Sequence, residues 1–409
     1  MNILVLVQIF DTPMESGSDR NYFFYKKFCE YGFDVNVITS NIDYKSASPR
    51  FPNNNSNLKK NIKGISVEYL NVYTNIRGSF FRRTIFYLSY FFKALKLIIK
   101  KKDVDLIYAV STPLSTGFLG VLASKILKAP LVFEVTDVWP DAAIYSGVLK
   151  NKFLIYFLKF FEKICYKNSN KIIALTEGIA NNIQDKIRDK KKVLLISNGV
   201  DVELFDQISE NSRENIRKKY DINSKIVCTY LGAHGRYNSL NTVLKAANIL
   251  KSNHKFKFIL IGDGDEKIKL KEKSKKYNLK NIIFLDPIPR SKSLEFLNGS
   301  DIFLLPNLKG DFFDGNLPNK LFDYMAAARP IIVSGSRESS ELVKKADCGV
   351  CVEAENEEAI ARNILSLGKM SFEERFEIGR KGSEYVKLHF NREKHSKLLI
   401  DIIMGIKKN

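Results

Sequence analysis

The stretch that decides the fold reads Asp301-Ile-Phe-Leu-Leu305, then, after a long loop, Pro318-Asn-Lys-Leu-Phe-Asp-Tyr-Met-Ala-Ala-Ala-Arg-Pro330, and directly afterwards Ile331-Ile-Val-Ser334. Its two ends are short, continuous apolar runs, which are typical of parallel strands buried on both faces. The middle part starts with proline, and Leu321 and Met325 recur at helical spacing. A strand, a helix and a second strand in this order predict a right-handed βαβ unit.

The same alternation of short apolar runs and longer amphipathic stretches continues through the 409 residues, which is the pattern of an α/β fold with parallel sheets. It pauses once, at residues 198–206, and then restarts, so we expect two doubly wound Rossmann-like domains. The predicted strands are Ile3–Ile9, Asp34–Thr39, Ser66–Val72, Asp105–Val110, Leu131–Val135, Lys171–Leu175 and Val193–Ser197 in the first domain, and Ile226–Leu231, Phe256–Ile261, Ile282–Leu285, Ile302–Leu305, Ile331–Ser334 and Val350–Val352 in the second.

The predicted domains span residues 1–200 and 201–390, with a hinge near Gly199–Ser212. The last helical stretch, Glu393–Ile406, has no strand after it, so residues 391–409 are expected to cross back onto the first domain. Ligands of open α/β sheets bind at the carboxyl ends of the strands. We therefore expect the two domains to face each other across a cleft that these ends line.

Composition indicates a globular chain with an anionic partner, because 45% of the residues are hydrophobic and the formal net charge is +20. Met1–Lys192 holds 29 Lys and Arg against 16 Asp and Glu. The alternative is a coding bias that inflates lysine. The five cysteines are scattered, and Cys348-x-x-Cys351 lacks a second pair of metal ligands, so we predict core thiols in the reducing cytosol. The sequence predicts no signal peptide and no membrane-spanning helix.

The loop and helix start at residues 306–330 provide the clearest anion site in the sequence. Asn316 is a candidate helix cap and Pro318 suits the first turn, so backbone N–H groups there would face the cleft and hold phosphate. Lys320 adds a positive charge, and Asp323 lies on the same side of the helix, where a carboxylate accepts hydrogen bonds from a ribose diol. The alternative is an ordinary amphipathic helix that carries no ligand.

Three other strand ends carry candidate groups. In the second domain, Leu231-Gly-Ala-His-Gly-Arg236 combines glycines with an arginine that can hold a diphosphate through its guanidinium fork, and His234 is a minor candidate. Gly262-Asp-Gly264 ends the next strand. In the first domain, Val135-Thr-Asp-Val-Trp-Pro-Asp141 offers Asp137 as a group that orients the reacting sugar, or simply caps a turn. Gly17 precedes the first helix and would let a diphosphate approach the backbone.

Taken in this order, these pieces resemble glycosyltransferase family 4, the retaining transferases of the GT-B fold, over nearly the whole chain. Within the family they resemble the bacterial branch that builds capsule, O-antigen or exopolysaccharide. The resemblance is carried by the loop with Gly17, Asp137-Val-Trp-Pro140, Asn198-Gly-Val-Asp201, Gly262-Asp-Gly264 and, most specifically, Pro318–Pro330.

The resemblance implies sugar transfer from a nucleoside diphosphate donor without a metal or other cofactor. It implies that Asp323 holds the ribose, that Arg236 and Gly17 contact the diphosphate, and that Asp137 lies near the sugar. The implied catalytic residues are Asp137, Arg236 and Lys320. The implied donor site comprises Gly17, Gly232, Arg236, Gly262, Asp314, Gly315, Asn316, Leu317, Pro318, Lys320 and Asp323.

Two positions depart from the family pattern. The family often has two glutamates separated by seven residues, whereas this chain has Gly315 and Asp323 at those places. Either Asp314 or backbone N–H groups contact the sugar instead. The family lysine after the arginine is replaced here, where Leu240 and Asn241 stand, and Lys320 is the candidate to supply its charge.

A basic and aromatic segment, Arg77–Lys102, holds eight basic residues and no acidic one, which is typical of an interfacial helix on anionic lipid. A second such stretch, Leu149–Lys171, is expected to join it. The alternative is that both helices pack on the sheet and their lysines are merely solvated. The residues expected at the membrane or acceptor are Arg82, Arg83, Lys93, Lys96, Lys100 and Trp139.

The sequence thus predicts a glycosyltransferase on the cytoplasmic face of the bacterial cell membrane. The expected donor is a UDP-N-acetylhexosamine or a deoxy derivative, and the expected acceptor is a lipid-linked saccharide. Two alternatives are a sugar-nucleotide epimerase of GT-B-like fold, for which flanking acid and base residues are lacking, and a nucleic-acid-binding protein, for which no motif is present.

Overall fold

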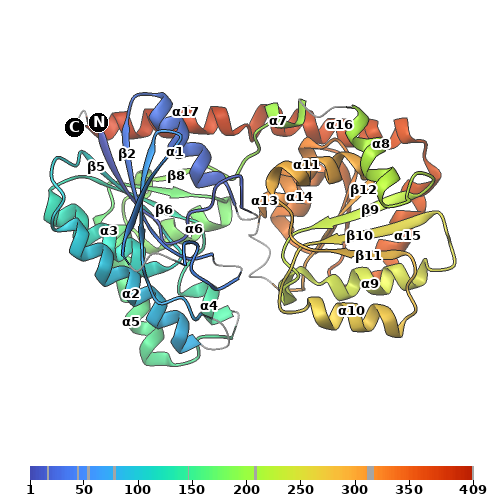
Figure 1. Ribbon diagram of the computed structural model, residues 1–409, viewed down its shortest axis with the longest axis horizontal. Coiled ribbons are helices and arrows are strands. Elements are labelled where there is room, and N and C mark those ends of the chain that lie inside the picture. Colours follow the sequence, from blue (N-terminus) through green and yellow to red (C-terminus); the bar gives the residue numbers. More distant parts are fainter. Residues whose placement is uncertain are drawn as a thin grey trace. The chain divides into compact units, whose positions relative to one another are not determined.

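The computed structural model describes residues 1–15, 18–43, 46–52, 56–76, 80–145, 147–206, 210–310 and 317–407. The chain divides into two compact units (Figure 1). The first consists of Met1–Thr12, Asp19–Ser197 and His395–Asn409, and the second of Pro13–Ser18 and Asn198–Lys394.

The first unit is built on an eight-stranded sheet of order β3-β4-β2-β1-β5-β6-β7-β8. All neighbours pair in parallel except β3 and β4, which form an antiparallel hairpin. From β1 the chain first adds strands on one side, through β2, and then returns to add β5 on the other side of β1, so the switch point lies between β1 and β5. The strands are β1 (Asn2–Leu6), β2 (Asp34–Ser40), β3 (Leu58–Ile62), β4 (Ile65–Leu70), β5 (Leu106–Val110), β6 (Leu131–Val135), β7 (Lys171–Ala174) and β8 (Val193–Leu195).

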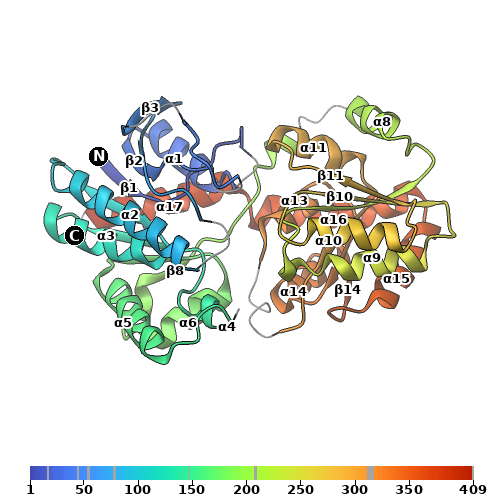
Figure 2. The ribbon, with the colours of Figure 1, turned by 60° about the horizontal axis from the view of Figure 1, so that its bottom comes forward.

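Helices cover both faces of this sheet (Figures 1 and 2). Apolar side chains of α2, α3, α5 and α6 pack on one face, and those of α1 and α17 pack on the other. The helices are α1 (Arg20–Glu30), α2 (Phe80–Ile98), α3 (Leu114–Leu127), α4 (Asp141–Tyr145), α5 (Lys152–Asn168), α6 (Glu177–Lys186) and α17 (Arg392–Lys407), with a 3-10 turn at Lys190–Lys192.

The second unit is built on a six-stranded parallel sheet of order β11-β10-β9-β12-β13-β14. The chain runs outward from β9 through β10 to β11 and then returns to β12 on the other side of β9, which places the switch point between β9 and β12. The strands are β9 (Ile226–Leu231), β10 (Phe256–Ile261), β11 (Ile282–Leu285), β12 (Ile302–Pro306), β13 (Ile331–Ser334) and β14 (Gly349–Val352).

This second sheet is also buried on both faces. Side chains of α9, α10 and α15 cover one face, and those of α8, α11, α13, α14 and α16 cover the other. The helices are α7 (Glu203–Asp206), α8 (Glu210–Lys219), α9 (Leu240–Ile249), α10 (Lys267–Lys276), α11 (Arg290–Gly299), α13 (Asn319–Ala326), α14 (Arg337–Lys345), α15 (Glu357–Lys369) and α16 (Phe372–His389), with a 3-10 turn at Arg236–Asn238.

The chain passes between the units four times, at Thr12–Pro13, Ser18–Asp19, Ser197–Asn198 and Lys394–His395. The crossing at Ser197–Asn198 lies slightly before the predicted domain boundary at residue 200. The last crossing falls within α17, whose residues Leu399 and Ile403 belong to the core of the first unit. Within the described residues, no helix is both long and apolar enough to cross a bilayer.

Candidate active site

The carboxyl ends of β9 and β12 bring the predicted anion-binding groups of the second unit together, at its switch point. Helix α13 follows β12 and is fixed in two ways. The Tyr324 ring stacks on Phe303 with centroids 4.3 Å apart, and the backbone N–H of Leu231 donates to the Tyr324 hydroxyl at 2.8 Å. The start of α13 is thereby held beside the loop that follows β9.

Two glycines allow the loops after β9 and β10 to approach each other. A Cβ at Gly262 would lie 1.9 Å from the carbonyl oxygen of Gly232, and Gly262 has a positive φ of 142°. A Cβ at Gly232 would lie 2.7 Å from Nζ of Lys320. Because only glycine fits at these positions, the Lys320 amine reaches the backbone of the β9 loop.

Lys320 is the central cation of the site. Its Nζ donates to the Tyr230 hydroxyl at 2.7 Å and to Oδ1 of Asn238 at 3.1 Å, and it lies 4.2 Å from the centre of the Tyr230 ring. Among the described residues no carboxylate pairs with it. Burial lowers the pKa of the Lys320 ammonium to about 7, because the charged form loses water without gaining a counter-ion. An anion that enters here would supply that counter-ion.

Arg236 lies in the same loop, two residues before Asn238, and its side chain is exposed. It is therefore free to turn toward an anion near Lys320. Leu317 and Pro318 precede α13, and Pro318 occupies the N-cap position, with the helix beginning at Asn319. The sequence placed Pro318 inside the first turn, so this prediction is wrong by one position. Lys320 lies in the first turn, as predicted.

Asp323 forms an ion pair with Arg290, which the sequence did not predict. Both of its carboxylate oxygens accept from Arg290, the first residue of α11: Nη1 lies 2.5 Å from Oδ2 and Nη2 lies 2.6 Å from Oδ1. Asp323 is only 7% exposed. The pair is a nearly buried fork, the strongest geometry available to a guanidinium and a carboxylate.

His234, the minor candidate, is buried completely between the rings of Tyr230 and Phe284. Burial and the nearby Lys267 ammonium lower its pKa to about 4, so the imidazole is neutral at pH 7. Neither ring nitrogen has a hydrogen-bond partner in the part of the chain that the structure describes. Its backbone carbonyl accepts from Glu266 N–H, and the residue packs the loop rather than facing solvent.

Four predicted donor-site residues, Gly17, Asp314, Gly315 and Asn316, lie outside the described residues. Groups of three or more side chains that could hold a metal ion are absent from the described part of the chain. The expectation of a metal-free reaction stays a prediction.

In the first unit, the loop after β6 carries Asp137 and Trp139. Asp137 is exposed, and its Oδ2 accepts from the Thr112 hydroxyl, in the loop after β5, at 3.2 Å. Trp139 is half-buried against the core. Asp141 is engaged in structure: its Oδ2 accepts from Lys186 Nζ at 2.8 Å. Asp137 thus remains available near the switch point of its own sheet.

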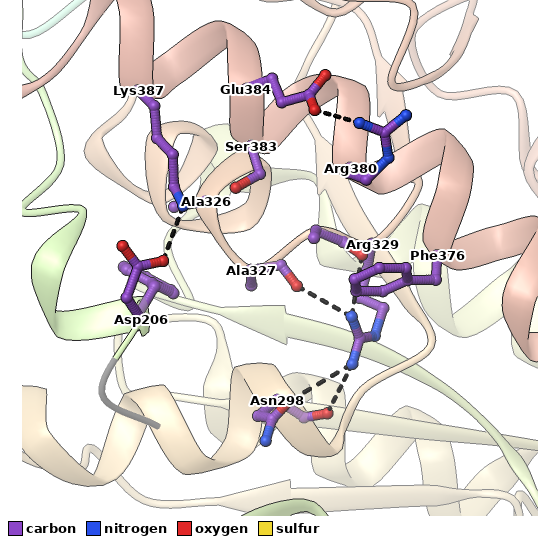
Figure 3. A pocket seen from close by; sticks show the side chains of 12 residues that line it. Asp206, Asn298, Ala326, Ala327, Arg329, Phe376, Arg380, Ser383, Glu384 and Lys387 are labelled. Carbon is purple, nitrogen blue, oxygen red and sulfur yellow. Dashed lines mark hydrogen bonds and ion pairs between the residues drawn. The ribbon is translucent and has the colours of Figure 1, made fainter. Parts of the chain in front are cut away.

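One cavity of about 340 Å³ lies elsewhere in the second unit, at the carboxyl end of α13 (Figure 3). Arg329 lines it, and its guanidinium donates to the carbonyls of Ala327, Ala328 and Ser300 and lies over the Phe372 and Phe376 rings. Arg329 therefore binds carbonyl groups at the carboxyl end of α13. The cavity contains none of the predicted site residues, and we assign it no part in catalysis.

Sequence reasoning missed Arg290, Tyr230 and Asn238. Arg290 follows the predicted strand Ile282–Leu285 by a few residues, so the rule that sites form after strands could have suggested it. Nothing in the sequence pairs it with Asp323, because the contact spans two βαβ units. Tyr230 was assigned only to a strand core, which hid its hydroxyl at the strand end.

Two doubly wound units, each with polar groups gathered at its switch point, define a glycosyltransferase of the GT-B fold. HepE of Anabaena, solved in complex with UDP-glucose, matches with a TM-score of 0.74 over 99% of this chain and 100% of that one, at 14% identity. The chain belongs to glycosyltransferase family 4: residues 24–204 match the model described as Glycosyltransferase Family 4, and residues 212–385 match Glycosyl transferases group 1.

Curated relatives agree with this family. An uncharacterized glycosyltransferase of Methanocaldococcus jannaschii is 24% identical over 73% of this chain and 74% of its own length. The N,N'-diacetylbacillosaminyl-diphospho-undecaprenol alpha-1,3-N-acetylgalactosaminyltransferase of Campylobacter jejuni is 23% identical over 68% of this chain and 72% of its own length. The enzyme is therefore a transferase, in preference to the epimerase and the nucleic-acid-binding alternatives.

Proposed function

We propose that this enzyme is a retaining glycosyltransferase that moves a sugar from a nucleoside diphosphate donor to a lipid-linked saccharide during bacterial surface-polysaccharide synthesis. The observation that carries the donor part is Lys320: a largely buried cation, at the switch point of the second unit, that lacks an acidic partner among the described residues. A diphosphate suits this place by charge, and Gly232 leaves bare backbone beside the amine.

In the proposed reaction the donor diphosphate leaves as an anion. Lys320, Arg236 and the amino end of α13 stabilise the negative charge that develops on it, and groups fixed in advance do so at no cost of reorganisation. We assign no side chain as a covalent nucleophile, so a front-face displacement with retention is the proposed course. Asp137 orients the reacting sugar, and Gly17, Gly262, Leu317 and Pro318 border the donor.

Uridine is the proposed base, and an N-acetylhexosamine or a deoxy derivative is the proposed sugar. Support comes from two neighbours: HepE was solved with UDP-glucose, and the Campylobacter jejuni relative is named as an N-acetylgalactosaminyltransferase acting on an undecaprenol-linked sugar. The same name supports the lipid-linked acceptor. No metal or other cofactor enters the proposal.

Lys320→Met tests the donor site. Removing the charge should weaken donor affinity or turnover by about 10²-fold, the loss typical of one preorganised donor group. Lys344→Met, at an exposed lysine of α14, is the matched control and should keep both. Calorimetric titration of UDP-sugar and a turnover assay measure the two effects. Unchanged affinity and turnover in folded Lys320→Met would refute the placement of the diphosphate.

Membrane contact is the second part of the proposal, and α2 supports it. One face of α2 is buried through Phe86, Tyr90, Ala94 and Ile98. The face on the opposite side of the helix exposes apolar side chains at helical spacing: Phe81 (70%), Leu88 (46%), Phe92 (63%) and, just past the helix end, Ile99 (62%).

Basic side chains border this exposed stripe. Arg82, Arg83, Lys93, Lys96 and Lys100 are all exposed, although Lys93 Nζ also donates to the Asn71 carbonyl. A helix with one face on its own core, an apolar face outward and lysines beside it suits an anionic lipid surface. Phe86 and Tyr90 do pack on the sheet, and Tyr87 and Phe91 are partly buried against the same core, whereas Phe81 and Phe92 are exposed.

Helix α5 extends the surface. It lies on the same face of the sheet as α2, with α3 between them (Figure 2). Phe118 of α3 stacks on Phe91 of α2 and meets Phe161 of α5 edge-on, with ring centroids 4.7 Å apart. Four aromatic side chains of α5 are exposed among lysines of the same helix. They are Phe153 (80%), Tyr156 (74%), Phe157 (48%) and Phe160 (55%).

These two stripes support a peripheral enzyme on the cytoplasmic face of the bacterial membrane, where a polyprenyl-linked acceptor resides. Trp139, half-buried in the loop after β6, is the proposed contact with the acceptor. The product would be a repeat unit of capsule, O-antigen or exopolysaccharide.

A further inference from the structure

The pair of Arg290 and Asp323 has a consequence for which donors the enzyme takes. In the proposed donor site, we give Asp323 the role that the family resemblance implies, that of the carboxylate beside the nucleoside ribose. Its two oxygens already accept from the two Nη atoms of Arg290, at 2.5 and 2.6 Å. The side chains are 12% and 10% exposed, so little water competes with the pair.

The position of the pair follows from the fold. Arg290 is the first residue of α11, after the loop that leaves β11, and Asp323 lies one turn beyond Lys320 on α13. Both helices lie on the same face of the second sheet. The pair therefore lies next to the cation that would receive the diphosphate, where the nucleoside must follow.

A ligand hydroxyl is discriminated strongly only when its absence leaves a buried group unpaired. A lone buried carboxylate would lose its partner if the ribose lacked a hydroxyl, and such a loss weakens binding by about 10- to 100-fold. Asp323 keeps two charge-assisted hydrogen bonds from Arg290 whether the hydroxyl is present or not. A carboxylate has about four acceptor positions, so it can still bind the ribose, but it does not depend on it.

We propose that Arg290 is a specificity-determining residue that makes the enzyme tolerant of 2′-deoxyribose, so that its donors include 2′-deoxyribonucleoside diphosphate sugars as well as ribonucleotide ones. Arg290 acts on this choice by satisfying Asp323, and it need not touch the sugar itself. The inference rests on the proposed donor site.

The test compares matched nucleotides in calorimetric titrations of the full chain: UDP with 2′-deoxy-UDP, GDP with 2′-deoxy-GDP and ADP with 2′-deoxy-ADP. For the base that binds best, the affinities of the wild-type protein for the ribonucleotide and for its 2′-deoxy analogue should differ by less than about 5-fold. The reason is that the missing hydroxyl leaves no acceptor of Asp323 unpaired. A preference for the ribonucleotide above about 20-fold would overturn the inference and leave the proposed function standing.

Arg290→Met supplies the second arm. Among the described residues the Asp323 carboxylate then keeps no side-chain partner, so the preference for the ribonucleotide should rise to about 20-fold or more. An unchanged ratio in the folded variant would overturn the inference. Because an unpaired buried carboxylate can prevent folding, Arg290→Lys is a second variant, which keeps the charge but loses the fork. Its ratio should lie above that of the wild type, and an unchanged ratio would count equally against the proposal. Failure of every nucleoside diphosphate to bind wild-type protein would overturn both proposals.

Discussion

At the scale of single residues, Lys320 is the residue on which the proposed donor site depends, and its protonation should report the binding of a diphosphate. Its pKa of about 7 reflects burial, with no carboxylate paired to it in the described part of the chain, and a bound diphosphate would raise this pKa. Donor affinity should therefore fall as pH rises from about 7 to 9, by up to tenfold per pH unit, because the free enzyme has lost the proton that the complex holds. Calorimetry of a UDP-sugar in buffers of different ionisation enthalpy should detect proton uptake above pH 7, since the diphosphate diester of the donor does not titrate there. A pH-independent affinity, equal to that of Lys320→Met, would show that this amine does not meet the diphosphate.

At the scale of elements, α2 and α5 carry the membrane part of the account. Exchanging Phe92 and Tyr156 for serine removes two exposed rings without touching the buried face of either helix. Binding to vesicles of anionic lipid should weaken by about tenfold or more for each ring, given the free energy of burying an aromatic side chain. Ile268→Ser, at a 73% exposed residue of α10 in the second unit, is the control and should bind as wild type does. Equal sedimentation of both proteins with anionic vesicles, or the failure of wild-type protein to sediment with them, would contradict the assignment.

The sequence predicted the limits of the buried strands more accurately than any other feature of the structure. Buried parallel strands read as continuous apolar runs, and β6, β9, β10, β11 and β13 have the predicted limits. The strand that escaped, β3, reads Leu58-Lys-Lys-Asn-Ile62 and lies at the edge of the sheet, where polar side chains face water and no apolar run exists. The exposed apolar stripe of α2 could not be located from the sequence. Helical periodicity separates apolar from basic residues, but it cannot tell which apolar face packs on the sheet.

The candidate site was predictable in part. Lys320, Arg236 and the glycines could be found because each follows a strand, and the carboxyl ends of parallel strands meet at one edge. The partners of these residues could not be found. Arg290 and Asp323 are 33 positions apart in the chain, and only the packing of α11 and α13 on one sheet face brings them together. The role of Asp323 depends on that neighbour more than on its own place in the helix.

At the scale of the whole molecule, two units of one architecture have different surfaces and different site chemistry. The first carries the exposed apolar stripes and Asp137, and the second carries Lys320 and the pair of Arg290 and Asp323. The chain passes between them four times, the last time within α17, whose apolar residues complete the core of the first unit. An apolar surface on one unit and an anion-binding group on the other are consistent with the proposed transferase, which takes a soluble donor and a lipid-linked acceptor.

The central claim is sugar transfer from a nucleoside diphosphate donor to a lipid-linked acceptor, and the most direct measurement is the release of nucleoside diphosphate. The enzyme is incubated with UDP-, GDP-, TDP- or ADP-sugars, with and without a polyprenyl-diphosphate-linked saccharide. One donor should release its nucleoside diphosphate about 10²-fold faster or more when the acceptor is present, since leaving-group departure is coupled to acceptor attack. The product should keep the anomeric configuration of the donor. Conversion of the donor sugar without release, or release that ignores the acceptor, would contradict the account.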